Sequence, residues 1–265
     1  MTQHRPRKRF GQHFLHDAGV LARIVAAIAP APGDLLVEIG PGEGALTLPL
    51  LERVGRLEAI EIDRDLAARL AENISPDRLR VHCADALDFD FGTLPEGLRL
   101  VGNLPYNVST PLLFRLAEFA DRVRDMHFML QLEVVERMVA RPSTPAYGRL
   151  SVMLQTRFRL EKLFRVARGA FRPPPTVDSA FVRMSPLGRA TRETVDFRRL
   201  SMLVAGAFSA RRKKLKNALP LDAAEFRALA VDSDLRPENL SPADYLRVAR
   251  FVAQRDDRGA RVERA

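Results

Sequence analysis

The stretch Val37-Glu38-Ile39-Gly40-Pro41-Gly42-Glu43-Gly44 decides the fold. It follows a short apolar run and precedes a helical pattern over residues 45–54, so it predicts a strand, a tight turn and a helix in succession. Glycines in such a turn let a ligand approach the backbone closely, because they carry no side chain. The spacing is G-x-G-x-G, whereas dinucleotide-binding proteins typically have G-x-G-x-x-G. Taken alone, this motif is equally compatible with a ligand-binding turn and with an ordinary tight turn.

Around this unit, from Leu35 to about Ser185, short apolar runs alternate with helical patterns, which is typical of an α/β fold with a doubly wound sheet. We expect strands at residues 35–39, 57–62, 79–82, 98–101, 126–130 and 180–184. We expect helices at residues 45–54, 65–73, 110–119 and 133–140, the third with Thr110 as N-cap. Beyond Pro186 the pattern is helical over residues 197–254. The prediction is a Rossmann-like domain over 1–186 and a small all-helical domain over 187–265, with a disordered tail at 254–265.

Composition limits the functional classes. The single Cys83 excludes an internal disulfide, and five scattered histidines without ligand spacing argue against a metal site. The chain has no apolar run of about 18 residues and no signal peptide, so we expect a cytoplasmic protein with no membrane partner. A net charge of +9 favours a polyanionic partner such as nucleic acid. Most of the cations are arginines, which suits phosphate contacts, although GC-rich codon usage would give the same bias.

Two carboxylates follow the glycine turn on the next two strands. Glu61 ends the second strand 21 residues after Gly40, the distance at which a carboxylate accepts hydrogen bonds from ribose hydroxyls. Asp85 follows the third strand and can accept a hydrogen bond from an adenine amino group. Together these residues predict an S-adenosylmethionine-dependent methyltransferase, with NAD as the alternative cofactor.

A second loop, Asn103-Leu104-Pro105-Tyr106, follows the fourth strand of this series. The amino nitrogen of a purine is a poor nucleophile because its lone pair is delocalised into the ring. If the Asn103 side-chain oxygen and the Leu104 carbonyl accept its two N–H bonds, they favour a pyramidal nitrogen aimed at the methyl group. Tyr106 would stack on the base, and Phe171, ahead of three prolines, would close the other face. Core packing is the alternative for Phe171, and the base must be single-stranded or flipped out.

These motifs resemble those of the small-subunit rRNA adenine N6-dimethyltransferases, the kasugamycin-sensitivity enzymes of bacteria. Besides the two loops, the resemblance rests on Phe10-Gly11-Gln12-His13-Phe14-Leu15, Gln131-Leu132-Glu133-Val134, Tyr147-Gly148-Arg149-Leu150-Ser151-Val152, Pro175-Thr176-Val177-Asp178-Ser179 and Phe208-Ser209-Ala210-Arg211-Arg212-Lys213. It implies transfer of four methyl groups to two adjacent adenosines in the 3′-terminal hairpin of 16S rRNA, within the 30S subunit or its assembly intermediate. The implied cofactor contacts are His13, Leu15, Gly40, Glu61, Asp85 and Asn103. Many family members have Asn at the position of His13.

Other readings remain open. The 23S rRNA adenine dimethyltransferases of erythromycin resistance share both loops, but Val177-Asp178-Ser179 and a helical run over residues 208–219 resemble the small-subunit group better. The cations of that run, Arg211, Arg212, Lys213, Lys214 and Lys216, are expected to contact rRNA phosphates, the alternative being a solvated helix face. A ribosome-assembly factor whose binding matters more than its chemistry is a second class. DNA adenine and protein-glutamine methyltransferases carry a related loop, but with proline where this chain has Leu104. Nothing in the sequence demands more than a monomer.

Overall fold

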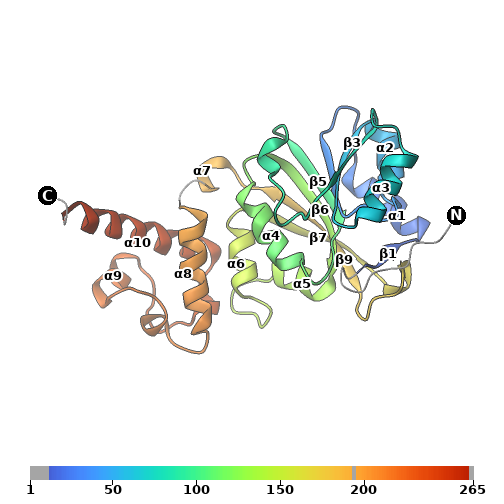
Figure 1. Cartoon of the computed structure of the whole chain (residues 1–265). Helices are drawn as coiled ribbons and strands as arrows, with labels where there is room; N and C mark the ends of the chain where they lie inside the picture. Colours follow the sequence, from blue (N-terminus) through green and yellow to red (C-terminus); the bar gives the residue numbers. More distant parts are fainter. Residues whose placement is uncertain (1–11, 193–194, 263–265) are drawn as a thin grey trace. The chain divides into compact units, whose positions relative to one another are not determined.

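A computed structural model of the chain describes residues 12–192 and 195–262 (Figure 1). Phe10 and Gly11 of the N-terminal motif lie outside the described residues. The structure divides into two compact units. The first contains the described residues up to Val135 and Leu160–Pro186, and the second contains Glu136–Arg159 and the described residues from Leu187 onward. The boundary after Pro186 lies where the sequence predicted a domain boundary. Glu136–Arg159 lies within the expected domain 1–186 but packs with the second unit.

The first unit is built on a seven-stranded sheet with the strand order β4-β3-β2-β5-β6-β9-β7 (Figure 1). Its strands are β2 (Leu36–Ile39), β3 (Leu57–Glu61), β4 (Leu79–Cys83), β5 (Leu98–Asn103), β6 (Val123–Gln131), β7 (Phe158–Val166) and β9 (Ser179–Pro186). Neighbours from β4 to β6 pair in parallel, and β9 pairs antiparallel with β6. Two short strands, β1 (Phe14–Leu15) and β8 (Phe171–Arg172), form a separate antiparallel pair. The chain order reverses between β2 and β5, and in open α/β sheets such a switch is where ligands bind.

The helices of this unit are α1 (Ala18–Ile28), α2 (Thr47–Val54), α3 (Arg64–Asn73), α4 (Ser109–Glu118) and α5 (Leu132–Met138), which runs into the second unit. Figure 1 shows α1, α2 and α3 on one side of the sheet and α4 on the other. Apolar side chains of the first three helices, such as Ile24, Leu50 and Leu70, form one buried cluster with strand residues. The sheet is therefore covered on both faces, which is why its central strands are apolar on both sides.

The predicted α/β class and all six predicted strands are confirmed, with ends that differ by a few residues. Strand β7 and helix α1 were not predicted. The burial of β7 does not alternate cleanly, because it is an edge strand with many charged residues. Thr110 is not an N-cap: α4 begins at Ser109 behind Val108, which makes no side-chain capping bond.

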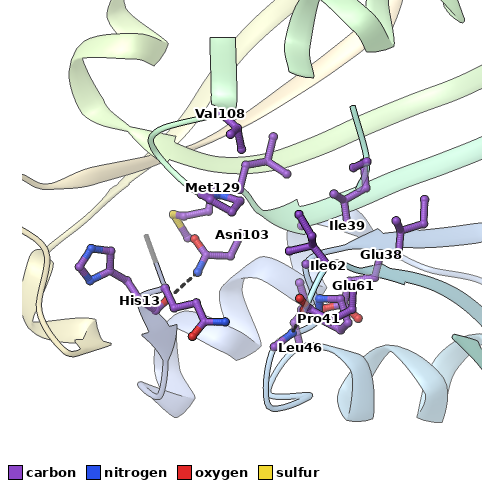
Figure 2. A pocket seen from close by; sticks show the side chains of 18 of the residues that line it. His13, Glu38, Ile39, Pro41, Leu46, Glu61, Ile62, Asn103, Val108 and Met129 are labelled. Carbon is purple, nitrogen blue, oxygen red and sulfur yellow. Dashed lines mark hydrogen bonds between the residues drawn. The ribbon is translucent and has the colours of Figure 1, made fainter. Parts of the chain in front are cut away.

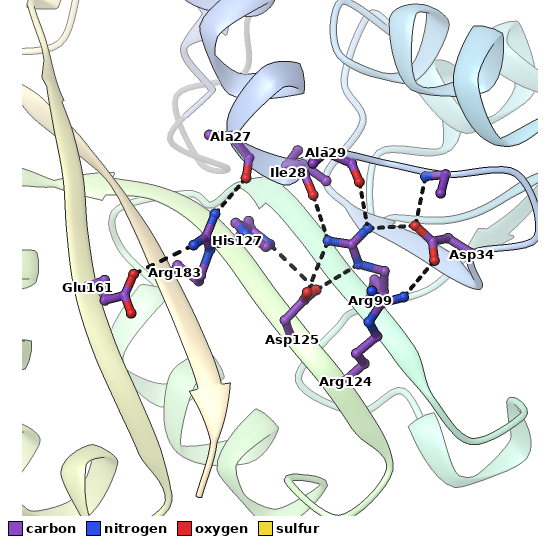
Figure 3. Close-up of polar contacts among 11 residues, drawn as sticks. Ala27, Ile28, Ala29, Asp34, Arg99, Arg124, Asp125, His127, Glu161 and Arg183 are labelled. Carbon is purple, nitrogen blue, oxygen red and sulfur yellow. Dashed lines mark hydrogen bonds and ion pairs between the residues drawn. The ribbon is translucent and has the colours of Figure 1, made fainter.

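A buried charged network lies at the amino-terminal ends of β5 and β6 (Figure 3). Arg99 is only 4% exposed, and its guanidinium donates to Asp34 at 2.6 Å and to Asp125 at 2.9 and 3.0 Å. It also donates to the carbonyls of Ile28 and Ala29 at the end of α1. Because the last carbonyls of a helix have no partner within the helix, this arginine both caps α1 and neutralises two carboxylates.

The second unit is helical. Its helices are α6 (Arg149–Gln155), α7 (Arg189–Arg192), α8 (Phe197–Ser209), α9 (Ala223–Ala228) and α10 (Pro242–Val262). Helices α6, α8 and α10 pack against one another, and the buried hydroxyls of Tyr147 and Tyr245 donate to the carbonyls of Leu240 and Pro237. Within the described residues, no helix has the length and apolar character needed to cross a bilayer.

Two predictions for this unit are wrong. The tail is not disordered up to Val262, because α10 continues through it. The buried stripe of α10, including Val248 and Ala249, lies before Gln254, and residues 254–257 are exposed on the same continuous helix, which their charged composition allows. The run 208–219 is not one helix either. Helix α8 ends at Ser209, turns follow, and a single 3₁₀ turn covers Leu215–Asn217.

Candidate functional site

A cavity opens at the carboxyl ends of the parallel strands, within the first unit (Figure 2). The loops after β2, β3, β4 and β5 line it, together with the segment around β1. It contains every predicted cofactor and catalytic residue except Phe171, namely His13, Leu15, Gly40, Glu61, Asp85, Asn103, Leu104 and Tyr106. Gly40, Glu61, Asp85 and Asn103 converge because parallel strands carry successive loops to one edge of the sheet, and the segment around β1 adds His13 and Leu15.

The glycine turn forms the floor of this cavity. Gly40, Gly42 and Gly44 have φ angles of 70°, 59° and 85°, a region that disfavours residues with a side chain. A Cβ atom on Gly42 would also lie 3.0 Å from the Phe14 ring. The turn therefore needs glycine for its backbone shape and for close approach, and Ala45 and Leu46, just before α2, also line the cavity.

Glu61 is the last residue of β3 and is 5% exposed. Its Oε1 accepts from the backbone N–H of Asp63 at 2.9 Å, and its Oε2 accepts from that of Gly42 at 3.1 Å. Burial raises the pKa of the carboxyl, while these two bonds oppose the shift. The bonds fix the carboxylate between the glycine turn and the end of β3. Each oxygen keeps a further lone pair for another donor.

Glu38 is a second buried acid in the cavity wall, 2% exposed. Its Oε2 accepts from the Thr47 hydroxyl at 2.7 Å. Burial, with some help from the nearby Glu61 charge, raises its pKa to about 7. Glu38 is not among the predicted site residues, although it belongs to the motif Val37-Glu38-Ile39-Gly40. An acidic residue in an otherwise apolar strand was the available signal.

Asp85 lies in the turn after β4. One carboxylate oxygen, Oδ1, accepts from the Leu87 backbone N–H at 2.9 Å. The residue is partly exposed and lines the cavity beside Ala84 and Ala86. This hydrogen bond holds the carboxylate at the cavity edge and leaves its other oxygen for a ligand donor.

Asn103 ends β5, and its side-chain amide has a defined orientation. Its Nδ2 donates to the backbone carbonyl of His13 at 2.8 Å (Figure 2). Because the carbonyl can only accept, the nitrogen must face His13, and Oδ1 is the end available to a ligand. The N-terminal segment therefore sets which end of the amide is presented.

Tyr106 is fixed by its hydroxyl, which shares a 2.6 Å hydrogen bond with Ser179 Oγ of β9. Burial raises the pKa of this phenol, so it stays protonated near neutral pH. Ser179 is fully buried and belongs to the Pro175-Thr176-Val177-Asp178-Ser179 motif. Ser179 is not among the predicted site residues, because its partner Tyr106 is 73 positions away and no local pattern indicates the contact.

Phe171 does not line the cavity. It is 2% exposed and belongs to the buried apolar cluster, where β8 pairs Phe171 with Leu15. In this structure Phe171 is therefore a core residue, and its contact with one face of the target base stays a prediction. The antiparallel pairing with β1 turns the side chain into the core, so the packing alternative describes it.

The five cations of the predicted RNA contact differ in their surroundings. Arg211 pairs with Glu238 at 2.5 Å, and Lys214 and Lys216 pair with Asp234 at 3.2 and 2.9 Å. Arg212 and Lys213 are exposed and make no ion pair within the described residues. Only the latter two thus present uncompensated charge to a polyanion.

The cavity fits S-adenosylmethionine in its donor and acceptor set. Glu61 retains acceptor capacity for two vicinal hydroxyls, and Asp85 offers a carboxylate oxygen on the neighbouring strand. Ile62, which is 41% exposed, presents an apolar surface on the same side. Within residues 12–192 and 195–262, no group of metal-ligating side chains gathers.

Comparison with known proteins gives consistent results. A family model described as "Ribosomal RNA adenine dimethylase" matches residues 3–254. The chain is 58% identical over 260 residues to the "Ribosomal RNA small subunit methyltransferase A" of Aromatoleum aromaticum, covering 97% of this chain and 98% of that one. Among solved structures, a dimethyladenosine transferase from Plasmodium falciparum matches with a TM-score of 0.76, 26% identity and coverage of 89% and 96%. The 23S rRNA methyltransferase ErmE matches with a TM-score of 0.67, 28% identity and coverage of 89% and 98%.

Proposed function

The chain belongs to the ribosomal RNA adenine dimethylase family, and we propose on this premise that it methylates two adjacent adenosines in the 3′-terminal hairpin of 16S rRNA. The enzyme is an S-adenosylmethionine-dependent rRNA adenine dimethyltransferase. Its product is N6,N6-dimethyladenosine. The relatives named for the small subunit are more similar to this chain than the structure named for 23S rRNA is, which favours the small-subunit substrate.

The observation that carries the proposal is the orientation of the Asn103 amide. With Nδ2 donated to His13, Oδ1 can accept one N–H of the target amine, and the Leu104 carbonyl can accept the other. Two acceptors on the two N–H bonds favour a pyramidal nitrogen and concentrate its lone pair opposite them. Tyr106, held by Ser179, supplies a stacking face for the flipped-out base.

On the cofactor side, Glu61 binds the ribose hydroxyls and Asp85 the adenine amino group. Gly40 allows close approach of the backbone, and the segment from His13 to Leu15 lines the cavity. S-adenosylmethionine, when bound, supplies an electrophilic methyl group. The methylated nitrogen becomes strongly acidic and releases its proton to water, so the site needs no dedicated base. Positioning and electrostatics supply the catalysis.

Arg212 and Lys213, with smaller contributions from Arg211, Lys214 and Lys216, would contact rRNA phosphates. The proposed substrate is the 30S subunit or its assembly intermediate, encountered in the cytoplasm by a monomeric enzyme. Binding through these cations also suits a role in small-subunit biogenesis.

The test is transfer of tritium from labelled S-adenosylmethionine to 30S subunits that lack the modification, with unmodified 50S subunits in parallel. We expect labelled dimethyladenosine in 30S alone. Asn103→Ala should abolish transfer while 30S binding persists, and Asn73→Ala, an exposed asparagine on α3, should leave transfer unchanged. Label in 50S, or normal transfer by Asn103→Ala, would contradict the proposal.

A further inference from the structure

The segment between β7 and β9 carries three exposed arginines, Arg165, Arg168 and Arg172, that take no part in the proposed chemistry. Arg165 lies near the end of β7, Arg168 opens a 3₁₀ turn over Arg168–Ala170, and Arg172 ends β8. Neighbouring side chains of a strand point to opposite faces. Since Phe171 is buried in the core, Arg172 is turned to solvent.

Hydrogen bonds hold the backbone of this segment in place. Asp178 Oδ2 accepts from the Arg165 guanidinium at 2.8 Å, and its Oδ1 accepts from the backbone N–H of Arg168 at 3.0 Å. The carbonyl of Ala170 also accepts from the backbone N–H of His16 at 3.0 Å. The backbone that carries the arginines is therefore fixed before a ligand arrives, which lowers the entropy lost on binding.

Positive charge exceeds negative charge in this segment. Residues 165–178 contain three arginines and a single acid, Asp178. Asp178 forms an ion pair with Arg165, whereas Arg168 and Arg172 make no ion pair within residues 12–192 and 195–262. The hydrogen bonds from Arg165 and from the Arg168 N–H lower the pKa of Asp178, so one negative charge stays in place and two guanidinium groups remain available to an anion.

The segment borders the target side of the cavity at two places. Pro173 follows Arg172, and its carbonyl oxygen lies 2.8 Å from Nδ1 of His13, a residue of the cavity wall. Ser179 follows the segment at its other end and shares a 2.6 Å hydrogen bond with the Tyr106 hydroxyl. A base reaches Tyr106 only when its nucleotide is flipped out. The phosphates on either side of that nucleotide then come to the rim of the cavity, where this segment lies.

We propose that Arg168 and Arg172 form a second RNA-binding surface, which holds backbone phosphates of the rRNA strand beside the flipped-out adenosine. This inference rests on the proposed function. Arginine suits the role because its planar guanidinium can donate two hydrogen bonds to one phosphate. Such contacts position a nucleic acid without reading its sequence. The surface belongs to the first unit, so it holds the strand at the cavity itself, whereas Arg212 and Lys213 belong to the second unit.

The experiment measures filter binding of 30S subunits that lack the modification, over a series of salt concentrations. Arg168→Gln and Arg172→Gln are combined in one variant. Each phosphate contact contributes about one to the slope of log affinity against log salt concentration, so the slope should fall by up to about two. The ratio of wild-type to variant affinity should then shrink by up to about tenfold between about 50 mM and about 200 mM salt. Arg168→Lys with Arg172→Lys should keep most of the slope, because both charges remain.

Arg53→Gln combined with Arg80→Gln is the matched control. Both arginines are exposed, make no ion pair within the described residues and do not line the cavity. Arg80 lies on β4, at the opposite edge of the sheet from β7. The control removes the same net charge, so it separates a local contact from a general effect of charge, and it should lower the slope by less than half as much. Neither Arg168 nor Arg172 lines the cavity, so their replacement should leave S-adenosylmethionine affinity and thermal unfolding unchanged.

Three results would overturn the inference. The first is an unchanged slope in the variant that lacks Arg168 and Arg172. The second is an equal fall in the control variant, which would assign the effect to net charge. The third is a loss of S-adenosylmethionine affinity or of thermal stability that accompanies weaker 30S binding, which would assign the arginines a structural role. Failure of the proposed function is distinguishable, because the wild-type enzyme would then not methylate 30S subunits.

Discussion

Replacing Gly102 by alanine should damage both halves of the site at once. Gly102 lies near the end of β5, and an ideal Cβ there would be 2.3 Å from the carbonyl oxygen of Ile39 on β2. A carbon and an oxygen in ordinary contact are about 3.3 Å apart, so the two strands would have to separate by about 1 Å. The clash is with backbone, which cannot rotate away as a side chain would.

The size of the effect follows from this displacement. Forced overpacking costs about 1–3 kcal/mol, and we expect the upper end here because two strands must move. Gly40 follows Ile39 and Asn103 follows Gly102, so the cofactor turn and the target amide shift relative to each other. A misplacement of about 1 Å in an active site can cost about 100-fold in rate. We therefore expect Gly102→Ala to lose about 3 kcal/mol in the free energy of unfolding and about 100-fold in kcat/KM.

Urea unfolding, calorimetric titration with S-adenosylmethionine and tritium transfer to 30S subunits measure these effects. Gly169→Ala is the matched control, because a Cβ there meets nothing within 4 Å and its φ is outside the glycine-favouring region. If Gly102→Ala kept wild-type unfolding free energy and wild-type affinity, the close approach of β2 and β5 would not be what requires glycine.

Three further predictions concern pH, buried charge and RNA binding. The folded pKa of Glu38, about 7, exceeds its ordinary 4.5, so its contribution to stability is complete below pH 4.5 and is lost as pH rises through 7. The wild-type free energy of unfolding should therefore fall by roughly 3 kcal/mol from this group between about pH 5 and about pH 8, and Glu38→Gln should remove that fall. Urea unfolding at the two pH values measures it, and an unchanged pH profile in Glu38→Gln would refute the raised pKa of Glu38. Arg99→Ala should cost about 3–5 kcal/mol in unfolding free energy, because it removes the buried cation that pairs with Asp34 and Asp125, and a loss below about 1 kcal/mol would contradict this. Replacing Arg212 and Lys213 together by alanine should lower the slope of log affinity for 30S against log salt concentration by up to about two, measured by filter binding. Replacing Lys214 and Lys216 should lower this slope less, because Asp234 already pairs with both lysines.

Part of the site followed from the sequence alone. Gly40, Glu61, Asp85 and Asn103 each follow an apolar strand pattern, and all four line one cavity. This convergence could be predicted because the carboxyl ends of parallel strands share an edge of the sheet, whatever the details of packing. The apolar runs also indicated the α/β class, since strands buried on both faces must be continuously apolar.

Contacts between distant residues were decided only by the tertiary structure. The sequence predicted Phe171 at the target base, but its strand pairs with Leu15 and the side chain lies in the core, whereas the ring beside Tyr106 is that of His13. His13 and its Pro173 partner are 160 positions apart, and no local pattern records such a pairing. Likewise, charged composition hid the continuation of α10, because its buried residues, such as Val248 and Ala249, precede Gln254 and the exposed residues 254–257 only extend the helix. Local periodicity thus determined the elements and the sheet edge that carries the site, whereas the direction of each side chain depended on packing between elements far apart in the chain.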